Sequence, residues 1–197
     1  MLARLKRETK HPHAAAGTDR LQLASVETSE RYARFLGQIW GFEAPVEAAF
    51  ARTAGLAELV DLRARTAIRM LRADLTALGV TSPSSLPSTH SVPVLQLADA
   101  LGWMFVIERN AAVHAEVCAR LADRLPRSLS VAGSYLSSSA SSDERSVALG
   151  TALDRIARTP ELVLRITDAA VFAFARQRQW YRQPVPASST ARSHSVA

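Results

Sequence analysis

Few side chains in this sequence of 197 residues have the types and spacing that catalysis or metal binding requires. Cys118 is the only cysteine, so it forms neither an internal disulfide nor a cysteine-based zinc or iron–sulfur site. A di-iron site needs several carboxylates and histidines, including Glu-x-x-His pairs. Glu43 and Glu47 form one cluster of such residues, but their spacing does not match that of a di-iron site. His114 and Glu116 are the other, and theirs does not match either. No Ser–His–Asp triad or phosphate-binding loop is indicated.

The charge of the chain is the next guide to chemistry. The net charge is +6 and the pI is about 10.4. Of the 24 basic residues, only Lys6 and Lys10 are lysines. The arginines are spread along the chain without a run of five or six, and no aromatic residues interleave with them. This distribution favours solubility or non-specific electrostatics over a nucleic-acid partner.

The overall composition is that of one globular domain. Apolar residues make up 48% of the chain and charged residues 21%. No apolar run reaches the length of a bilayer span, so we expect no membrane association. The first twenty residues lack an apolar core and a cleavage site, so a secretory signal is not expected. A single cysteine suits a reducing compartment, and the predicted location is cytoplasmic.

The elements that must position any site are helices. Apolar residues recur every three or four positions over 31–52, 56–78 and 94–125, and strand-like alternation is weak. Pro45 should kink the first of these helices, and Gly79 is a plausible stop for the second. Thr159 before Pro160 is a good start for a last helix that runs to about residue 183. The sequence therefore predicts an all-α, single-domain fold of about six to eight helices.

The connecting segments are rich in small polar residues. Residues 81–93 hold several prolines and serines and are expected to form a loop. A second break is expected at 137–142, where Ser141 and Glu144 have the spacing of a capping box. We assign residues 1–183 to the helical domain, and we predict that residues 184–197 form a disordered tail.

Five segments resemble motifs of one known family, in the same order along the chain. Each is weak alone, because each is mostly a core pattern, whereas their order is the stronger signal. They lie at residues 5–13 (LKRETKHPH), 32–47 (YARFLGQIWGFEAPVE), 73–79 (ADLTALG), 101–108 (LGWMFVIE) and 168–174 (DAAVFAF), with Trp180 beyond. This pattern resembles the haem oxygenases, most closely the bacterial type that produces biliverdin.

The resemblance implies a haem oxygenase-like fold and a specific set of site residues. Members of that family hold haem between a proximal and a distal helix and convert it to biliverdin, CO and iron with O₂ and electrons. His13 aligns with the proximal iron ligand, and His11 is its near competitor. Lys6 and Lys10 align with basic positions that face the haem propionates. The implied partners are haem itself, a ferredoxin or flavoprotein reductase as electron donor, and a phytochrome that takes the product.

The sequence departs from the family where the distal helix should bend. The family has Gly-x-x-x-Gly-Gly after the glutamate, and the three glycine positions are Arg109, Val113 and His114 here. We expect Val113 and His114 to intrude on the distal space, and the helix to be straighter without glycine. On the proximal side, Pro12 should make the helix kink or restart just before His13.

Several functions therefore remain open from the sequence. The chain is expected to be a haem oxygenase, with activity reduced by the lost glycines. Alternatively it binds haem without turnover, with His114 offering a second axial ligand to the iron. In a third interpretation, side chains fill the pocket and the protein keeps only the fold, as a cofactor-free interaction partner. A Cys118 nucleophile of the kind found in thiaminases has no base placed near it by any motif.

Overall fold

The computed structural model describes residues 1–89, 92–138 and 142–183, and in this part of the chain every regular element is helical. The predicted all-α class is confirmed, and the chain forms one compact domain. In chain order, the helices are α1 (Leu2–Glu8), α2 (Lys10–Leu23), α3 (Ser29–Arg52), α4 (Leu56–Leu59), α5 (Leu62–Arg65), α6 (Ile68–Ala77), η1 (Pro83–Ser85), α7 (Leu97–Asn110), η2 (Ala111–Val113), α8 (His114–Arg124), α9 (Pro126–Val131), α10 (Ser134–Ser137), α11 (Ser142–Ile156) and α12 (Pro160–Tyr181).

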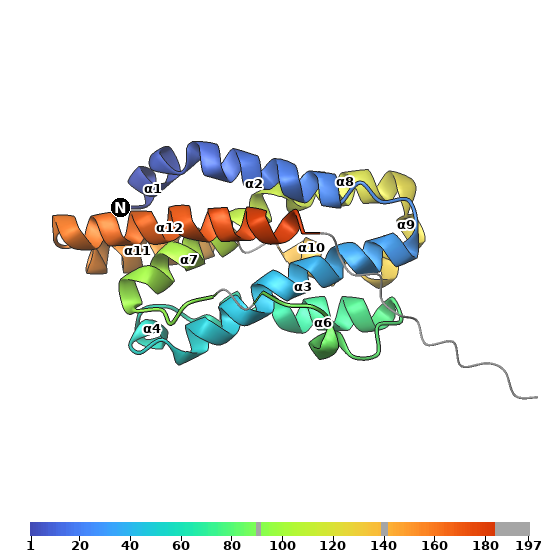
Figure 1. The fold of residues 1–197 in the computed structure, drawn as a ribbon, viewed down its shortest axis with the longest axis horizontal. Helices are drawn as coiled ribbons and strands as arrows, with labels where there is room; N and C mark the ends of the chain where they lie inside the picture. Colours follow the sequence, from blue (N-terminus) through green and yellow to red (C-terminus); the bar gives the residue numbers. More distant parts are fainter. Residues whose placement is uncertain (90–91, 139–141, 184–197) are drawn as a thin grey trace, which may run out of the picture.

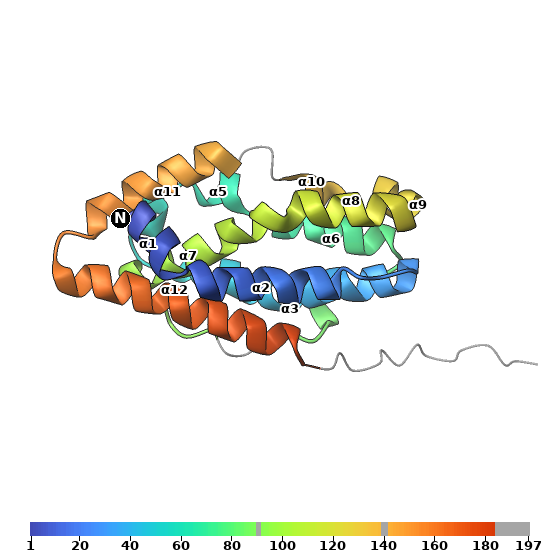
Figure 2. The ribbon, with the colours of Figure 1, turned by 90° about the horizontal axis from the view of Figure 1, so that it is seen from above.

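The long helices run along the longest axis of the molecule (Figure 1). α12 packs chiefly on α7 and α2, while α3 packs on α6. Seen from above, α11, α8 and α9 lie on one side of the molecule and α12 on the other, with α2 and α3 between them (Figure 2). α2, α3, α7, α8, α10 and α12 therefore enclose the interior in which a site would lie.

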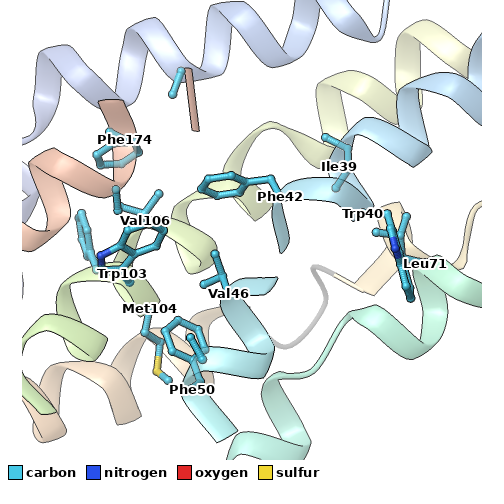
Figure 3. Packing of buried hydrophobic residues seen from close by; sticks show 14 of the residues in the cluster. Ile39, Trp40, Phe42, Val46, Phe50, Leu71, Trp103, Met104, Val106 and Phe174 are labelled. Carbon is cyan, nitrogen blue, oxygen red and sulfur yellow. The ribbon is translucent and has the colours of Figure 1, made fainter. Parts of the chain in front are cut away.

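The core is built from the apolar faces of these helices. Phe42 of α3 points toward Trp103 and Val106 of α7, with Phe174 of α12 beyond them (Figure 3). The rings of Phe42 and Trp103 are stacked with centroids 6.2 Å apart. Burying aromatic rings of this size is a large part of what holds three helices together.

Two glycines of the family-like segments act as close-packing positions. A Cβ at Gly102 of α7 would lie 2.5 Å from the carbonyl oxygen of Ile166 in α12. A Cβ at Gly41 of α3 would lie 2.4 Å from the ring of Trp180. Since neither distance is possible between real atoms, both helix crossings require glycine.

Some helix boundaries differ from those predicted. The expected helix over 56–78 is instead α4, α5 and α6, because Asp61 caps α5 through its side chain and Glu47 binds the backbone N–H of Ala67 at 2.8 Å. Gly79 has φ +86° and follows the end of α6, as expected of a helix stop. α3 continues through Pro45 as a single helix. The proposed cap at Ser141 and the tail at 184–197 lie outside the described residues.

The predicted straight distal helix is also wrong. α7 ends at Asn110, and one 3₁₀ turn, η2, separates it from α8. This 3₁₀ turn contains Val113 and lies between Arg109 and His114, so the α-helix is interrupted here without a glycine. At the N-terminus, the chain restarts at Lys10 after a break at Thr9, in agreement with the expected effect of Pro12.

Candidate functional site

The structure brings most of the predicted site residues together along one interface. α2 lies beside the segment formed by α7, η2 and α8, and both run in the same direction (Figure 2). His13 meets Arg109, and one turn later Gly17 meets Val113. The candidate proximal residue and the three replaced glycine positions therefore line the two sides of one seam.

His13 is half-buried and already has a neighbour on one ring nitrogen. Its Nδ1 lies 3.3 Å from Nη2 of Arg109, and its ring packs on Phe174 with centroids 5.9 Å apart. Burial and the nearby Arg109 charge lower the pKa of His13, so the imidazole is neutral at pH 7. Because arginine only donates, Nδ1 accepts this bond and the ring proton sits on Nε2. That Nε2 is buried and has no hydrogen-bond partner.

The two lysines lie outside the seam. Lys6 is on α1 and Lys10 is the first residue of α2, and both side chains are exposed. The break at Thr9 separates Lys6 from the helix of His13, so the shared face expected from helical spacing does not extend across it. Lys10 and His13 remain on one helix, three residues apart. His11, the competing candidate ligand, is exposed.

The seam is closed by side chains where a haem would have to enter. A Cβ built on Gly17 would lie 3.5 Å from Cγ1 of Val113, which is ordinary van der Waals contact. A flat ring between two surfaces needs about 3.5 Å on each side, or about 7 Å in all. The residues present therefore do not fit a haem between α2 and η2 in this arrangement.

Beyond Gly17 the seam opens into a buried polar network centred on Arg20. The Arg20 side chain is 1% exposed. Its Nη1 donates to the hydroxyl of Tyr181 at 2.9 Å and lies 3.3 Å from Oε1 of Glu43. Its Nη2 donates to the hydroxyl of Tyr135 and to Nε2 of His114, at 2.5 and 3.1 Å. One guanidinium thus connects five elements of the fold.

The positive charge of Arg20 is stabilised by the oxygen atoms that surround its guanidinium. Burial alone would lower the pKa of Arg20, but the oxygens of Tyr135, Tyr181 and Glu43 raise it above its ordinary value. Burial also raises the pKa of Tyr135 and of Tyr181, so both phenols keep their protons. A buried ion pair with this many hydrogen bonds holds the surrounding helices in one arrangement.

His114 belongs to this network. Burial, together with the charges of Arg20 and Arg145, lowers the pKa of His114 to about 2. Its Nε2 accepts from Arg20, so the proton of the neutral ring is on Nδ1, which is buried without a partner. The unprotonated nitrogen, Nε2, is therefore already hydrogen-bonded to Arg20. The His114 ring also packs against the ring of Tyr135, with centroids 4.9 Å apart.

Glu43 extends the network to α12. It accepts from the Tyr135 hydroxyl and from the amide of Asn110, at 2.8 and 3.0 Å. The Asn110 oxygen in turn accepts from Nε2 of Gln177 at 2.8 Å. The residues missed by the sequence analysis are Arg20, Tyr135, Asn110, Gln177 and Tyr181. Arginine and glutamine normally mark exposed positions, so no pattern singled them out.

The other residues considered for chemistry do not assemble into a centre. Glu47 caps the start of α6 by accepting hydrogen bonds from the Thr66 hydroxyl and the Ala67 N–H. Burial raises the pKa of Cys118, which disfavours a reactive thiolate. Among residues 1–89, 92–138 and 142–183, no group of three or more His, Cys, Asp or Glu could hold a metal ion. In the same residues, no helix is long and apolar enough to cross a membrane.

Comparison with known proteins leaves the family undecided. No family model matches the chain, and no curated protein matches it. The haem oxygenase resemblance therefore rests on the five ordered segments and remains a prediction.

Proposed function

We propose that this chain is a haem oxygenase-like protein that has exchanged its haem for a buried polar network and acts as a cofactor-free binding protein. The observation that carries this proposal is the Arg20 network, which occupies the interior between α2, α3, α8, α10 and α12. A charged side chain that is 1% exposed is costly to maintain without compensating partners, and both terminal nitrogens of Arg20 have them. Such a network favours a single closed interior over one that opens to admit a large ligand.

The residues at the seam support the same interpretation. Val113 packs where the family has a glycine, and Arg109 occupies Nδ1 of His13. In the tautomer that this contact selects, His13 presents a proton on Nε2 rather than a lone pair to a metal.

A second candidate function is haem binding at His13, with or without ring cleavage. It is favoured by one observation, the buried Nε2 of His13 that lacks a hydrogen-bond partner. Binding there requires Arg109 and Val113 to move away from α2. Activity would further require an electron donor such as a ferredoxin or a flavoprotein reductase.

A hemin titration followed by absorbance separates the two candidates. We expect the wild-type chain to purify colourless and to show no saturable Soret band with stoichiometric hemin. A saturable band that is lost in His13→Ala would overturn the cofactor-free proposal. Bleaching of that band to a biliverdin spectrum with ascorbate or a ferredoxin system would establish the oxygenase.

A paired variant tests whether side chains close the site. Arg109→Gly with Val113→Gly removes both contacts to α2 and leaves the Arg20 network intact. We expect this double variant to gain a hemin band that depends on His13. The matched control is Arg127→Gly with Val131→Gly on α9, which makes the same two substitutions away from the seam.

A further inference from the structure

The exposed face of α12 carries an apolar patch that nothing in the described chain covers. Phe172 is 47% exposed and Leu164 is 54% exposed, although both are large apolar side chains. Val94, in the segment before α7, is 98% exposed and lines the same groove as Leu164 and Phe172. Contiguous exposed apolar surface of this kind on a soluble protein marks an interaction site.

The patch borders a groove with a volume of about 620 Å³. Trp103 and Leu95 contribute to its lining from the α7 side, and Leu164 and Phe172 do so from α12. The rings of Trp103 and Phe172 meet edge to face at 6.1 Å. The groove is therefore continuous with the exposed face of α12 and has an aromatic floor that a partner side chain can enter.

Charged residues lie at the two ends of this face with opposite signs. At 100° per residue, Glu161, Asp168, Phe172 and Arg176 fall within one arc of the helix. Glu161 is near the N-terminal end of α12, and Arg176 is fifteen residues further on, with its guanidinium over the Phe172 ring at 5.9 Å. Glu161, Asp168 and Arg176 form no ion pair within the described residues.

An acid at one end, a base at the other and apolar side chains between them make this face complementary to itself. We propose that α12 pairs with α12 of a second copy of this chain, antiparallel and about a two-fold axis between Asp168 and Ala169. In a two-fold interface each residue is used twice, so Glu161 of each copy faces Arg176 of the other. Phe172 of each copy then lies against the stem of Arg165, whose guanidinium is held by Asp99 at 2.8 Å.

In the same register, the Glu161 and Arg176 charges favour association of the two copies, whereas the Asp168 charge opposes it. Near the axis, the Asp168 carboxylate of one copy lies close to that of the other, and like charges oppose association. Removing this charge should therefore strengthen the pair. A basic partner protein on the same face would instead be weakened by the same change, which distinguishes the two occupants.

Sedimentation equilibrium of the full chain between about 1 and about 200 µM measures the association. We expect a dimer that Phe172→Asp disrupts. Glu161→Arg alone and Arg176→Glu alone should each weaken the dimer about tenfold, because each places like charges opposite one another. The two changes combined should restore it, while Arg127→Glu on α9 leaves it unchanged. Asp168→Asn should tighten the dimer.

The inference is overturned by a chain that stays monomeric at the highest concentration. It is equally overturned by a dimer that the charge exchanges do not affect, or by Asp168→Asn weakening it. The exchanged residues lie on the helix surface, so circular dichroism of each variant should match the wild type. The result does not depend on whether the protein binds hemin.

Discussion

Nη2 of Arg109 lies 3.3 Å from Nδ1 of His13, so the candidate iron ligand on α2 is hydrogen-bonded to the first of the three replaced glycine positions on α7. One turn along the same seam, a Cβ at Gly17 would be in van der Waals contact with Cγ1 of Val113. These two contacts join the helices that the resemblance would place on opposite faces of a haem. Two of the three positions at which the resemblance expects glycine, Arg109 and Val113, are therefore the positions that close the seam.

The Arg20–Glu43 pair should be the most sensitive point of the interior. We expect Arg20→Met to lower the free energy of unfolding by about 3 to 5 kcal/mol, because it leaves Glu43 buried without its cation. Arg20→Met with Glu43→Leu should cost less than the sum of the two single changes. Urea denaturation measures both. Arg165→Met, which breaks the exposed pair with Asp99, should lower the stability far less than Arg20→Met does.

His114 should make the protein sensitive to mild acid. Its pKa is lowered to about 2 in the folded chain, so below pH 6.5 the unfolded chain takes up a proton that the folded one does not. The wild type should therefore lose stability relative to His114→Gln as the pH falls from 6.5 to 5, with a slope that approaches about 1.4 kcal/mol per pH unit at the acid end. Denaturation of both proteins across that range gives this difference. His11→Gln is the control because His11 is exposed, and a constant gap for His114→Gln would refute the assignment.

Glu47 should give the opposite dependence on pH. Burial raises its pKa to about 7, partly offset by the bonds from Thr66 and Ala67. A raised carboxyl pKa means that its stabilisation is present below the unfolded value of 4.5 and is lost as pH rises through 7. Relative to Glu47→Gln, the wild type should lose stability between pH 4.5 and 7. Thermal unfolding at intermediate pH values tests this, with the exposed Glu58→Gln as the control.

Two glycines within helices should respond to alanine with opposite signs. Gly102→Ala should destabilise the protein by about 1 to 3 kcal/mol, because the new methyl group meets the backbone of α12. At Gly150 in α11, a Cβ would have only ordinary contact with Leu2 at 3.5 Å, so alanine should stabilise by up to about 1 kcal/mol. Chemical denaturation of the pair gives the comparison. Equal effects at the two positions would mean that the α7–α12 crossing tolerates a wider separation.

The helical class was readable from the sequence because the apolar spacing of the long helices is determined by local geometry. Thr159 before Pro160 predicted the start of α12, and the Thr159 side chain accepts from the N–H of Leu162. Gly79 predicted the end of α6. These signals act within a few residues, so no tertiary information was needed to find them.

The Arg20 network was not readable, because its meaning depends on residues distant in the chain. Arg20 lies on a helix with little apolar periodicity, and its neighbours in sequence give no sign that it is buried. The division of 56–78 was missed for a related reason. It depends on Glu47, twenty residues from the Ala67 N–H that it binds.

The position of the four Arg20 partners along the chain has a consequence for synthesis of the protein. Glu43 follows Arg20 closely, whereas His114 and Tyr135 are made much later, and Tyr181 is the last residue of α12. Until α12 has been synthesised, Arg20 of the nascent chain lacks the Tyr181 hydroxyl to which it donates in the folded protein. Contacts that span most of the chain form late. A truncated chain that ends before Tyr181 therefore lacks one partner of the Arg20 network, and we expect it to be more sensitive to proteolysis.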